Sequence, residues 1–145
     1  MEAGALAEAA NALDWTPEHS RRARAFPVYA AIRSLGSEGI AAIIEDNCAR
    51  ARELAAGLAE LPGCVILNDV VLNQVLFRFE DDAQTDEVLA RVQQSGRIWL
   101  SGTTWDGRKA IRVSVSNWQT SEEDVARTVA AFSAARSATA ASTSR

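Results

Sequence analysis

The sequence predicts an α+β fold in which helices cover one face of a mainly antiparallel sheet. The 145-residue chain is 48% hydrophobic and 23% charged, which is typical of a globular chain long enough to bury a core. Its periodic stretches follow the order helix, helix, strand, strand, helix, strand, strand, helix. Consecutive strands, one pair of which is joined by a tight-turn sequence, favour antiparallel pairing beneath a helical layer.

The first part of the chain predicts helices. Residues 2–13 are rich in alanine, which favours a helix, but they lack a strong apolar face. Phe26-Pro27 opens a helix, since proline suits a first helical turn, and Gly36 ends it. Ser37 caps a longer helix that stops at the sequence LPGC. Its apolar residues recur every three or four positions: Ile40, Ile43, Ile44, Cys48, Ala51, Leu54 and Leu58.

Four segments predict strands, near residues 64–69, 74–80, 97–102 and 109–116. The second segment alternates as a half-buried strand should, with one face formed by Val75, Phe77 and Phe79 and the other by Leu76, Arg78 and Glu80. Asp106-Gly107 is a strong tight-turn signal, so it predicts a hairpin between the third and fourth strands.

Two further helices complete the expected domain. Residues 85–96 predict a helix closed by Gly96, and Ser121 with Asp124 three positions later predicts the start of a helix that runs to about Arg136. The chain therefore divides into an N-terminal helix and irregular connector over 1–19, an α+β domain over 20–136 and a flexible polar tail over 137–145.

Composition excludes several functions. The net charge of −4 argues against general nucleic-acid binding, and no run of 18 apolar residues is present to span a membrane. The start lacks the pattern of a secretory signal, so a cytoplasmic protein is expected. Cys48 and Cys64 are isolated thiols without metal-ligand spacing, which predicts no metal site. His19 is the single histidine, and no glycine-rich phosphate loop occurs.

Arg112 is the strongest candidate for a binding residue. Alternation places Ile111, Val113 and Val115 on one face of the last strand and Arg112 and Ser114 on the other. Trp99 is expected on the same side as Arg112. A guanidinium beside hydroxyls and an indole can bind a carboxylate through two parallel hydrogen bonds. The alternative is an ordinary solvated arginine, which periodicity by itself favours.

A cluster of arginines precedes the helix that starts at Phe26. The sequence SRRARAFPVYAAIRSLG, residues 20–36, combines four arginines with a very apolar segment. An ordinary solvated face is one explanation, and a face turned toward a negatively charged ligand is the other.

Three stretches, residues 14–36, 70–79 and 101–125, resemble the carboxy-terminal part of the pyridoxal-phosphate-dependent group II decarboxylases, the relatives of the glutamate and aromatic-amino-acid decarboxylases. The resemblance covers roughly residues 13–133. The motifs SRRAR, LNQV and RVSVSN occur in the family's order, and together they make it specific.

The resemblance implies the small C-terminal domain of a fold-type I enzyme. In that family this domain packs on a large domain that binds pyridoxal 5'-phosphate, and the enzymes are homodimers of amino-acid metabolism. Arg112 matches an arginine that reaches the substrate carboxylate. Arg22, the second arginine of the SRR motif, matches an arginine near the active site. The expected partners are an amino-acid substrate and the missing large domain, with neither nucleic acid nor membrane.

The family's catalytic groups are not found in this chain. Its Schiff-base lysine belongs to a His-Lys motif upstream, whereas the only lysine here, Lys109, is expected in the hairpin and solvated. Trp15 lies where some relatives carry a loop tyrosine. The chain is thus expected to be an inactive fragment of a carboxy-lyase: a truncated product, a mis-assigned start or one part of a split enzyme. The alternatives are a stand-alone α+β module that binds a small molecule and a non-functional remnant.

Overall fold

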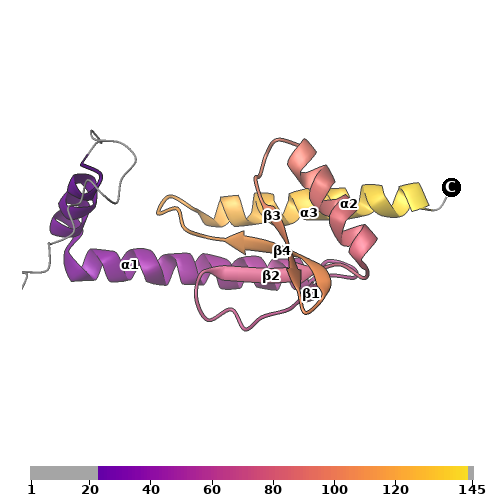
Figure 1. Ribbon diagram of the computed structural model, residues 1–145, viewed down its shortest axis with the longest axis horizontal. Coiled ribbons are helices and arrows are strands. Elements are labelled where there is room, and N and C mark those ends of the chain that lie inside the picture. The colour runs from indigo at the N-terminus through magenta and orange to yellow at the C-terminus, as the bar shows by residue number, and fades with distance from the viewer. Residues whose placement is uncertain (1–22, 144–145) are drawn as a thin grey trace, which may run out of the picture. The chain divides into compact units, whose positions relative to one another are not determined.

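The computed structural model describes residues 23–143, which form three helices and a four-stranded sheet (Figure 1). The elements in order are α1 (Ala25–Ala59), β1 (Val65–Ile66), β2 (Gln74–Arg78), α2 (Asp82–Gln94), β3 (Ser101–Trp105), β4 (Arg108–Ser114) and α3 (Glu122–Thr143). The α+β class predicted from the sequence is confirmed. Contacts divide the chain between Glu38 and Gly39 into two compact units, of which the second contains the sheet. The helix expected over 2–13 lies outside the described residues.

The sheet is antiparallel throughout, with the strand order β1-β2-β4-β3. The pairing of Trp105 with Arg108 leaves Asp106 and Gly107 as a two-residue turn between β3 and β4. Their φ angles are 48° and 72°, as a hairpin turn that follows the strand twist requires. The hairpin predicted from Asp106-Gly107 is therefore confirmed.

The third strand lies closer to the hairpin turn than predicted. Strand β3 begins at Ser101, so the expected strand over 97–102 is wrong except for its last two residues. The turn fixes the pairing of Trp105 with Arg108, and from there β3 pairs with β4 back to Ser101, which lies opposite Arg112. The segment before β3 is held by a side chain instead, since Gln93 Nε2 donates to the Leu100 carbonyl oxygen at 2.8 Å.

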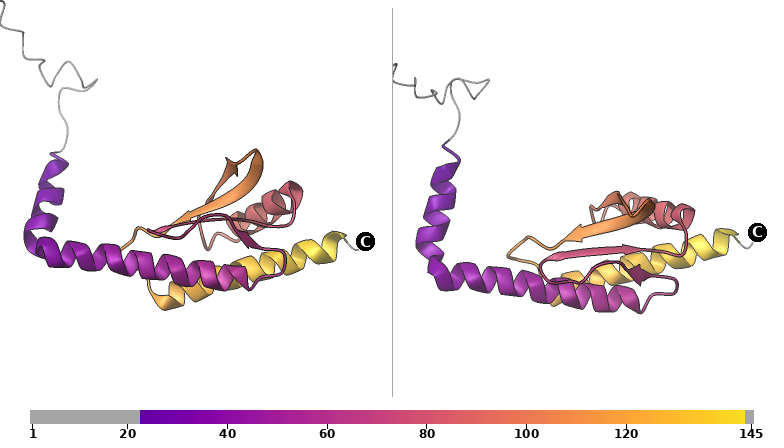
Figure 2. Two further views of the ribbon diagram at one scale, coloured as in Figure 1. Left: turned by 90° about the horizontal axis from the view of Figure 1, so that it is seen from below. Right: turned by 60° about the horizontal axis from the view of Figure 1, so that its bottom comes forward.

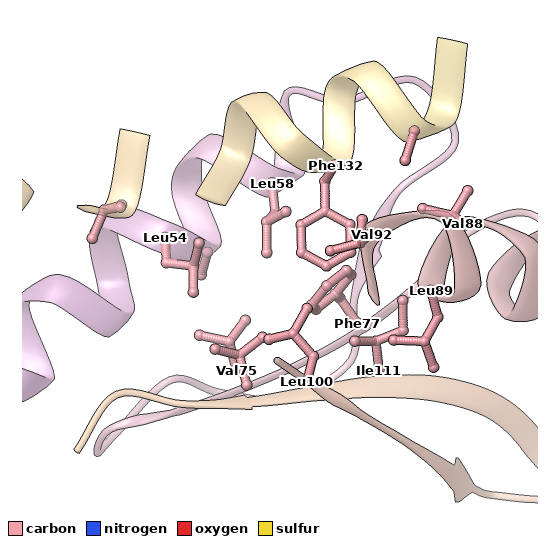
Figure 3. Close-up of a cluster of buried hydrophobic side chains, with 14 of the residues drawn as sticks. Leu54, Leu58, Val75, Phe77, Val88, Leu89, Val92, Leu100, Ile111 and Phe132 are labelled. Atoms are coloured by element: carbon pink, nitrogen blue, oxygen red, sulfur yellow. The ribbon is translucent and has the colours of Figure 1, made fainter. Parts of the chain in front are cut away.

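The hydrophobic core lies between the helices and one face of the sheet (Figures 2 and 3). Ile111 is fully buried, and Val113 and Val115 are nearly so, as alternation predicted. Figure 3 shows side chains of α1 and α3 above the sheet, with Phe132 of α3 over Phe77 of β2. The two rings meet edge to face, with centroids 5.1 Å apart and an interplanar angle of 84°.

Strand β2 is buried on both faces, which corrects the half-buried strand expected from the sequence. Leu76 and Arg78, expected on a polar face, are also buried. At Arg78 the outer face is flanked by Leu67 of the segment after β1 and by Trp105 and Arg108 of the β3–β4 hairpin, which line the same pocket. Arg78 is accommodated there by local acceptors, with Nε 3.0 Å from the Phe79 carbonyl oxygen.

Two predicted helix boundaries differ from the structure: the end expected at Gly36 and the start of α2. The helices expected on either side of Gly36 form one helix, α1, in which Gly36 alone has non-helical angles of φ 64° and ψ −173°. The helix is thus kinked at Gly36 and continues beyond it, where the sequence predicted its end. Helix α2 begins at Asp82 instead of near Thr85, because the Asp81 side chain caps it by accepting the Gln84 backbone N–H at 2.8 Å.

Helix α3 is longer than predicted. It ends at Thr143, beyond the expected end near Arg136. Alanines in this stretch favour the helix, and Thr139 within it is 2% exposed. Within residues 23–143, no helix has both the length and the apolar character that crossing a membrane requires.

The packing of Phe132 predicts a large effect on stability. Phe132→Ala should lower the free energy of unfolding by about 3–5 kcal/mol, because it removes a fully buried ring and leaves a cavity against Phe77. Urea unfolding of the chain measures the change. Phe26→Ala is the matched control, since Phe26 is 72% exposed and should change little. Equal losses for the two variants would contradict this account of the core.

Candidate functional site

Arg112 lies on the outer face of the sheet, the face opposite the helices that carries Arg108, Arg112 and Ser114 of β4. Its neighbours across the strands are Leu76 of β2 and Ser101 of β3. Ser114, two residues on, accepts a hydrogen bond from Gln74 Nε2 at 3.2 Å. Arg112 is exposed, and no described residue forms a hydrogen bond or ion pair with its guanidinium. Its donors are therefore available to a ligand on this face.

Arg112 also lines an open pocket of about 360 Å³. The pocket lies where β3 and β4 cease to pair, beyond the Ser101–Arg112 pair. Because the strands separate there, residues of both sheet faces reach it. The lining residues besides Arg112 are Leu54, Ile98, Trp99, Leu100, Ser101, Val113, Ser114, Val115, Thr120, Asp124, Val125 and Thr128.

The sequence-predicted group of Arg112, Trp99 and Ser114 is brought together in this pocket. Ser114 is exposed on β4 as alternation predicted, and Trp99 is 85% exposed although it lies before β3 and outside any strand. The role of the group in binding a carboxylate stays a prediction. Arg22, the second predicted site residue, lies outside the described residues. Arg24, from the same cluster, is exposed just before α1.

Asp124 is a pocket residue that sequence reasoning placed only at a helix start. Its Oδ2 accepts the backbone N–H of Ser121 at 2.8 Å and the Ser121 hydroxyl at 2.7 Å, and Arg127 donates to its other oxygen. The two bonds from Ser121, followed by that from Arg127, lower the pKa of Asp124 to about 2. The Asp124 charge is thus matched within α3, and Arg112 is left as the uncompensated charge in the pocket.

Lys109 does not fit the role of a lysine that holds pyridoxal phosphate. Its side chain is half exposed, and its Nζ lies 3.6 Å from Asp86 Oδ2. A Schiff-base lysine is enclosed beside its cofactor, whereas the Lys109 side chain is open to solvent and paired with a carboxylate. The backbone N–H of Lys109 is engaged as well, since it donates to Asp82 Oδ1 at 3.1 Å.

The two cysteines are poor nucleophiles in this fold. Cys48 is buried, which agrees with the inert thiol expected from its place in an apolar helix face. Burial raises the pKa of the Cys64 thiol to about 11. Because the thiolate is the reactive form, Cys64 stays unreactive near neutral pH.

The fold is shared with solved structures that include a tryptophan decarboxylase and an aldehyde synthase. TDC of Oryza sativa, in a structure with PLP and tryptamine, matches with a TM-score of 0.77 at 17% identity, over 87% of this chain and 29% of that chain. Tryptophan decarboxylase of Catharanthus roseus, in complex with L-tryptophan, matches with a TM-score of 0.73 at 19% identity, over 86% and 28%. Rhodiola rosea 4-hydroxyphenylacetaldehyde synthase matches with a TM-score of 0.74 at 23% identity, over 86% and 28%. Identities this low show the fold alone.

The sequence comparison points to the same class of protein. Tyrosine decarboxylase 2 of Arabidopsis thaliana is 28% identical over 123 residues, which are 79% of this chain and 23% of the relative. No family model matches the chain. The chain spans about a quarter of the length of the proteins it matches. The resemblance to group II decarboxylases predicted from the sequence is confirmed.

The hydrogen bonds of Asp124 predict its titration. We expect the Asp124 carboxyl to titrate near pH 2 instead of at its ordinary 3.8, as followed by NMR of the side-chain carbon. Because the folded-state pKa is depressed, this contact stabilises α3 above about pH 4 and is lost as the pH falls toward 2. Ser121→Ala should return the pKa toward 3.8.

Ser133→Ala is the control for that titration, since Ser133 is an exposed serine further along α3. It should leave the pKa of Asp124 unchanged. Because Ser121→Ala keeps the backbone N–H at position 121, a pKa that stayed near 2 would show that the Ser121 hydroxyl contributes little to the shift.

Proposed function

We propose that the chain is the carboxy-terminal part of a pyridoxal-phosphate-dependent amino-acid decarboxylase, in which Arg112 binds the substrate carboxylate. The observation that carries the proposal is the position of Arg112. It is exposed, has no partner among residues 23–143, and lines a pocket in a fold shared with amino-acid decarboxylases. The sequence similarity to tyrosine decarboxylase 2 supports the same assignment.

The chemistry of the Arg112 pocket suits a carboxylate. A guanidinium presents parallel N–H donors that match the two oxygens, and charge-assisted bonds of this kind are among the strongest in proteins. The hydroxyls of Ser101 and Ser114 lie on the same face, and the indole of Trp99 supplies an apolar surface for the rest of the ligand. The bound cofactor of such an enzyme supplies the electron sink. This chain contributes binding and orientation of the substrate.

The missing large domain is the proposed partner of the unit that ends at Glu38. The described helix of this unit exposes five apolar side chains: Phe26, Val28, Tyr29, Ile32 and Leu35. An exposed set of this size marks an interaction surface. We propose that the large domain covers it within a homodimeric cytoplasmic enzyme, and that Arg22, just before this helix, lies near the active site.

A stand-alone binding module is the second candidate, and one observation favours it. The unit from Gly39 onward contains a hydrophobic core with contributions from all three helices and the sheet. In that case Arg112 binds a small carboxylate without chemistry. Translation of the DNA upstream of the Met1 codon separates the two candidates. A large-domain sequence with the His-Lys motif supports the enzyme, and its absence supports the module or a non-functional remnant.

The environment of Lys109 predicts that the isolated chain does not attach the cofactor selectively. After incubation with pyridoxal phosphate and borohydride, peptide mass spectrometry should find no more modification at Lys109 than at the amino terminus. The reason is that Lys109 is solvated and paired with Asp86. Strong and selective labelling of Lys109 would refute the assignment of the Schiff-base lysine to a missing domain.

The role of Arg112 predicts a kinetic effect in a complete enzyme that carries this segment. Arg112→Lys should lower kcat/KM about ten- to hundredfold, because lysine keeps the charge but loses a two-point contact worth roughly 1.5–3 kcal/mol. Its thermal unfolding midpoint should hardly change, since Arg112 is exposed.

Arg52→Lys is the matched control, because Arg52 is an exposed arginine of α1 outside the Arg112 pocket. It should leave both the kinetics and the unfolding midpoint unchanged. Wild-type kinetics for Arg112→Lys would make Arg112 an ordinary solvated arginine.

A further inference from the structure

A second basic pocket lies near the hairpin turn, and it shares no lining residue with the Arg112 pocket. Its volume is about 490 Å³. The lining residues are Leu67, Arg78, Trp105, Asp106 and Arg108. They come from β2, from the β3–β4 hairpin and from the segment after β1, so residues distant in the sequence form it together.

Arg78 is the unusual residue of this pocket, because a buried arginine normally has all its donors engaged. Its side chain is 8% exposed. Nε donates to the Phe79 carbonyl oxygen at 3.0 Å, and Nη2 lies 3.3 Å from the Glu80 carbonyl oxygen and 3.2 Å from Asp82 Oδ1. Nη1 is buried and has no hydrogen-bond partner among the described residues. One end of the guanidinium is fixed, and the other still needs an acceptor.

The remaining walls define which acceptor fits. Arg108 pairs with Trp105 across the hairpin, and both side chains are exposed. Asp82 pairs with Arg78 and Asp106 adds a second carboxylate, so the charge that remains for an anion is the guanidinium of Arg108, which forms no ion pair with any described residue. Trp105 and Leu67 add apolar surface beside these donors. The combination suits an anionic group attached to an apolar body, as opposed to an inorganic ion.

We propose that this pocket is a second ligand site, which takes a small carboxylate with an aromatic body. Arg78 Nη1 and Arg108 donate to the carboxylate, and the indole of Trp105 contacts the ring. Because Nη1 is buried, the exposed side chains of Trp105 and Arg108 rearrange around the ligand as it enters. The proposal rests on these residues alone and does not depend on the role of Arg112.

The test is an NMR titration of the full chain with benzoate. The indole N–H of Trp105 and the amide of Gly107 report on this pocket, and the indole N–H of Trp99 reports on the Arg112 pocket. We expect saturable shifts at Trp105 and Gly107. Inorganic phosphate has the charge without the ring, and benzyl alcohol has the ring without the charge. Both should bind much more weakly than benzoate. Equal binding of either one would overturn the proposed ligand class.

Substitutions assign the binding to the pocket. Arg108→Gln should weaken the benzoate effect at Trp105 about tenfold or more, since it removes a charged donor from an exposed position that folding does not need. Arg112→Gln and the control Arg52→Gln should leave that effect unchanged. Arg78→Lys, checked for folding by circular dichroism, should also weaken it, because the fixed fork is lost.

Two outcomes would overturn the proposal. One is the absence of any saturable shift at Trp105. The other is a benzoate effect confined to Trp99 and lost in Arg112→Gln, which would assign all carboxylate binding to the Arg112 pocket.

Discussion

The alternation of buried and exposed residues along β4 is the constraint on which the rest of the structure depends. Ile111 and Val113 are held in the core, so the residues beside them must face outward. A slip of one residue would turn the whole apolar set toward solvent and bury Arg112. That exchange would lose the core contacts and also desolvate an unpaired charge, and both changes are costly. The direction of Arg112 is thus set by the packing of its neighbours.

Asp82 connects this strand to the rest of the second unit. Its Oδ1 accepts both Arg78 Nη2 and the backbone N–H of Lys109, at 3.2 Å and 3.1 Å. One carboxylate at the start of α2 therefore holds β2 and β4 at the end of the sheet near the hairpin. The Arg112 pocket lies farther along β4, where pairing with β3 has ended. The sheet is accordingly tied to α2 near the hairpin and open beside Arg112.

Sequence reasoning succeeded where the signal was local. The exposure of Arg112 follows from a period of two along its own strand, and the hairpin follows from two residues whose backbone preferences fit the turn. It was wrong where distant segments decide the outcome. The burial of Arg78 depends on residues of other segments, such as Leu67 and Trp105, and the start of β3 depends on register counted from the turn. Asp124 was missed as a pocket residue because the pocket joins α3 to strands that are distant from it in the sequence, and no local pattern shows that contact.

The chain has 14 arginines and one lysine, and three of these arginines, Arg78, Arg108 and Arg112, line the two pockets. Arg78 uses one guanidinium to reach two backbone carbonyls and a carboxylate, and it still has a donor to spare. An ammonium group has three donors on a flexible stem, so it could not hold the same fixed geometry. On the outer face the same planar group leaves Arg112 with parallel donors that no described residue engages. Arginine therefore supplies both the internal bracing of the sheet at Arg78 and the unengaged donors on its outer face at Arg112.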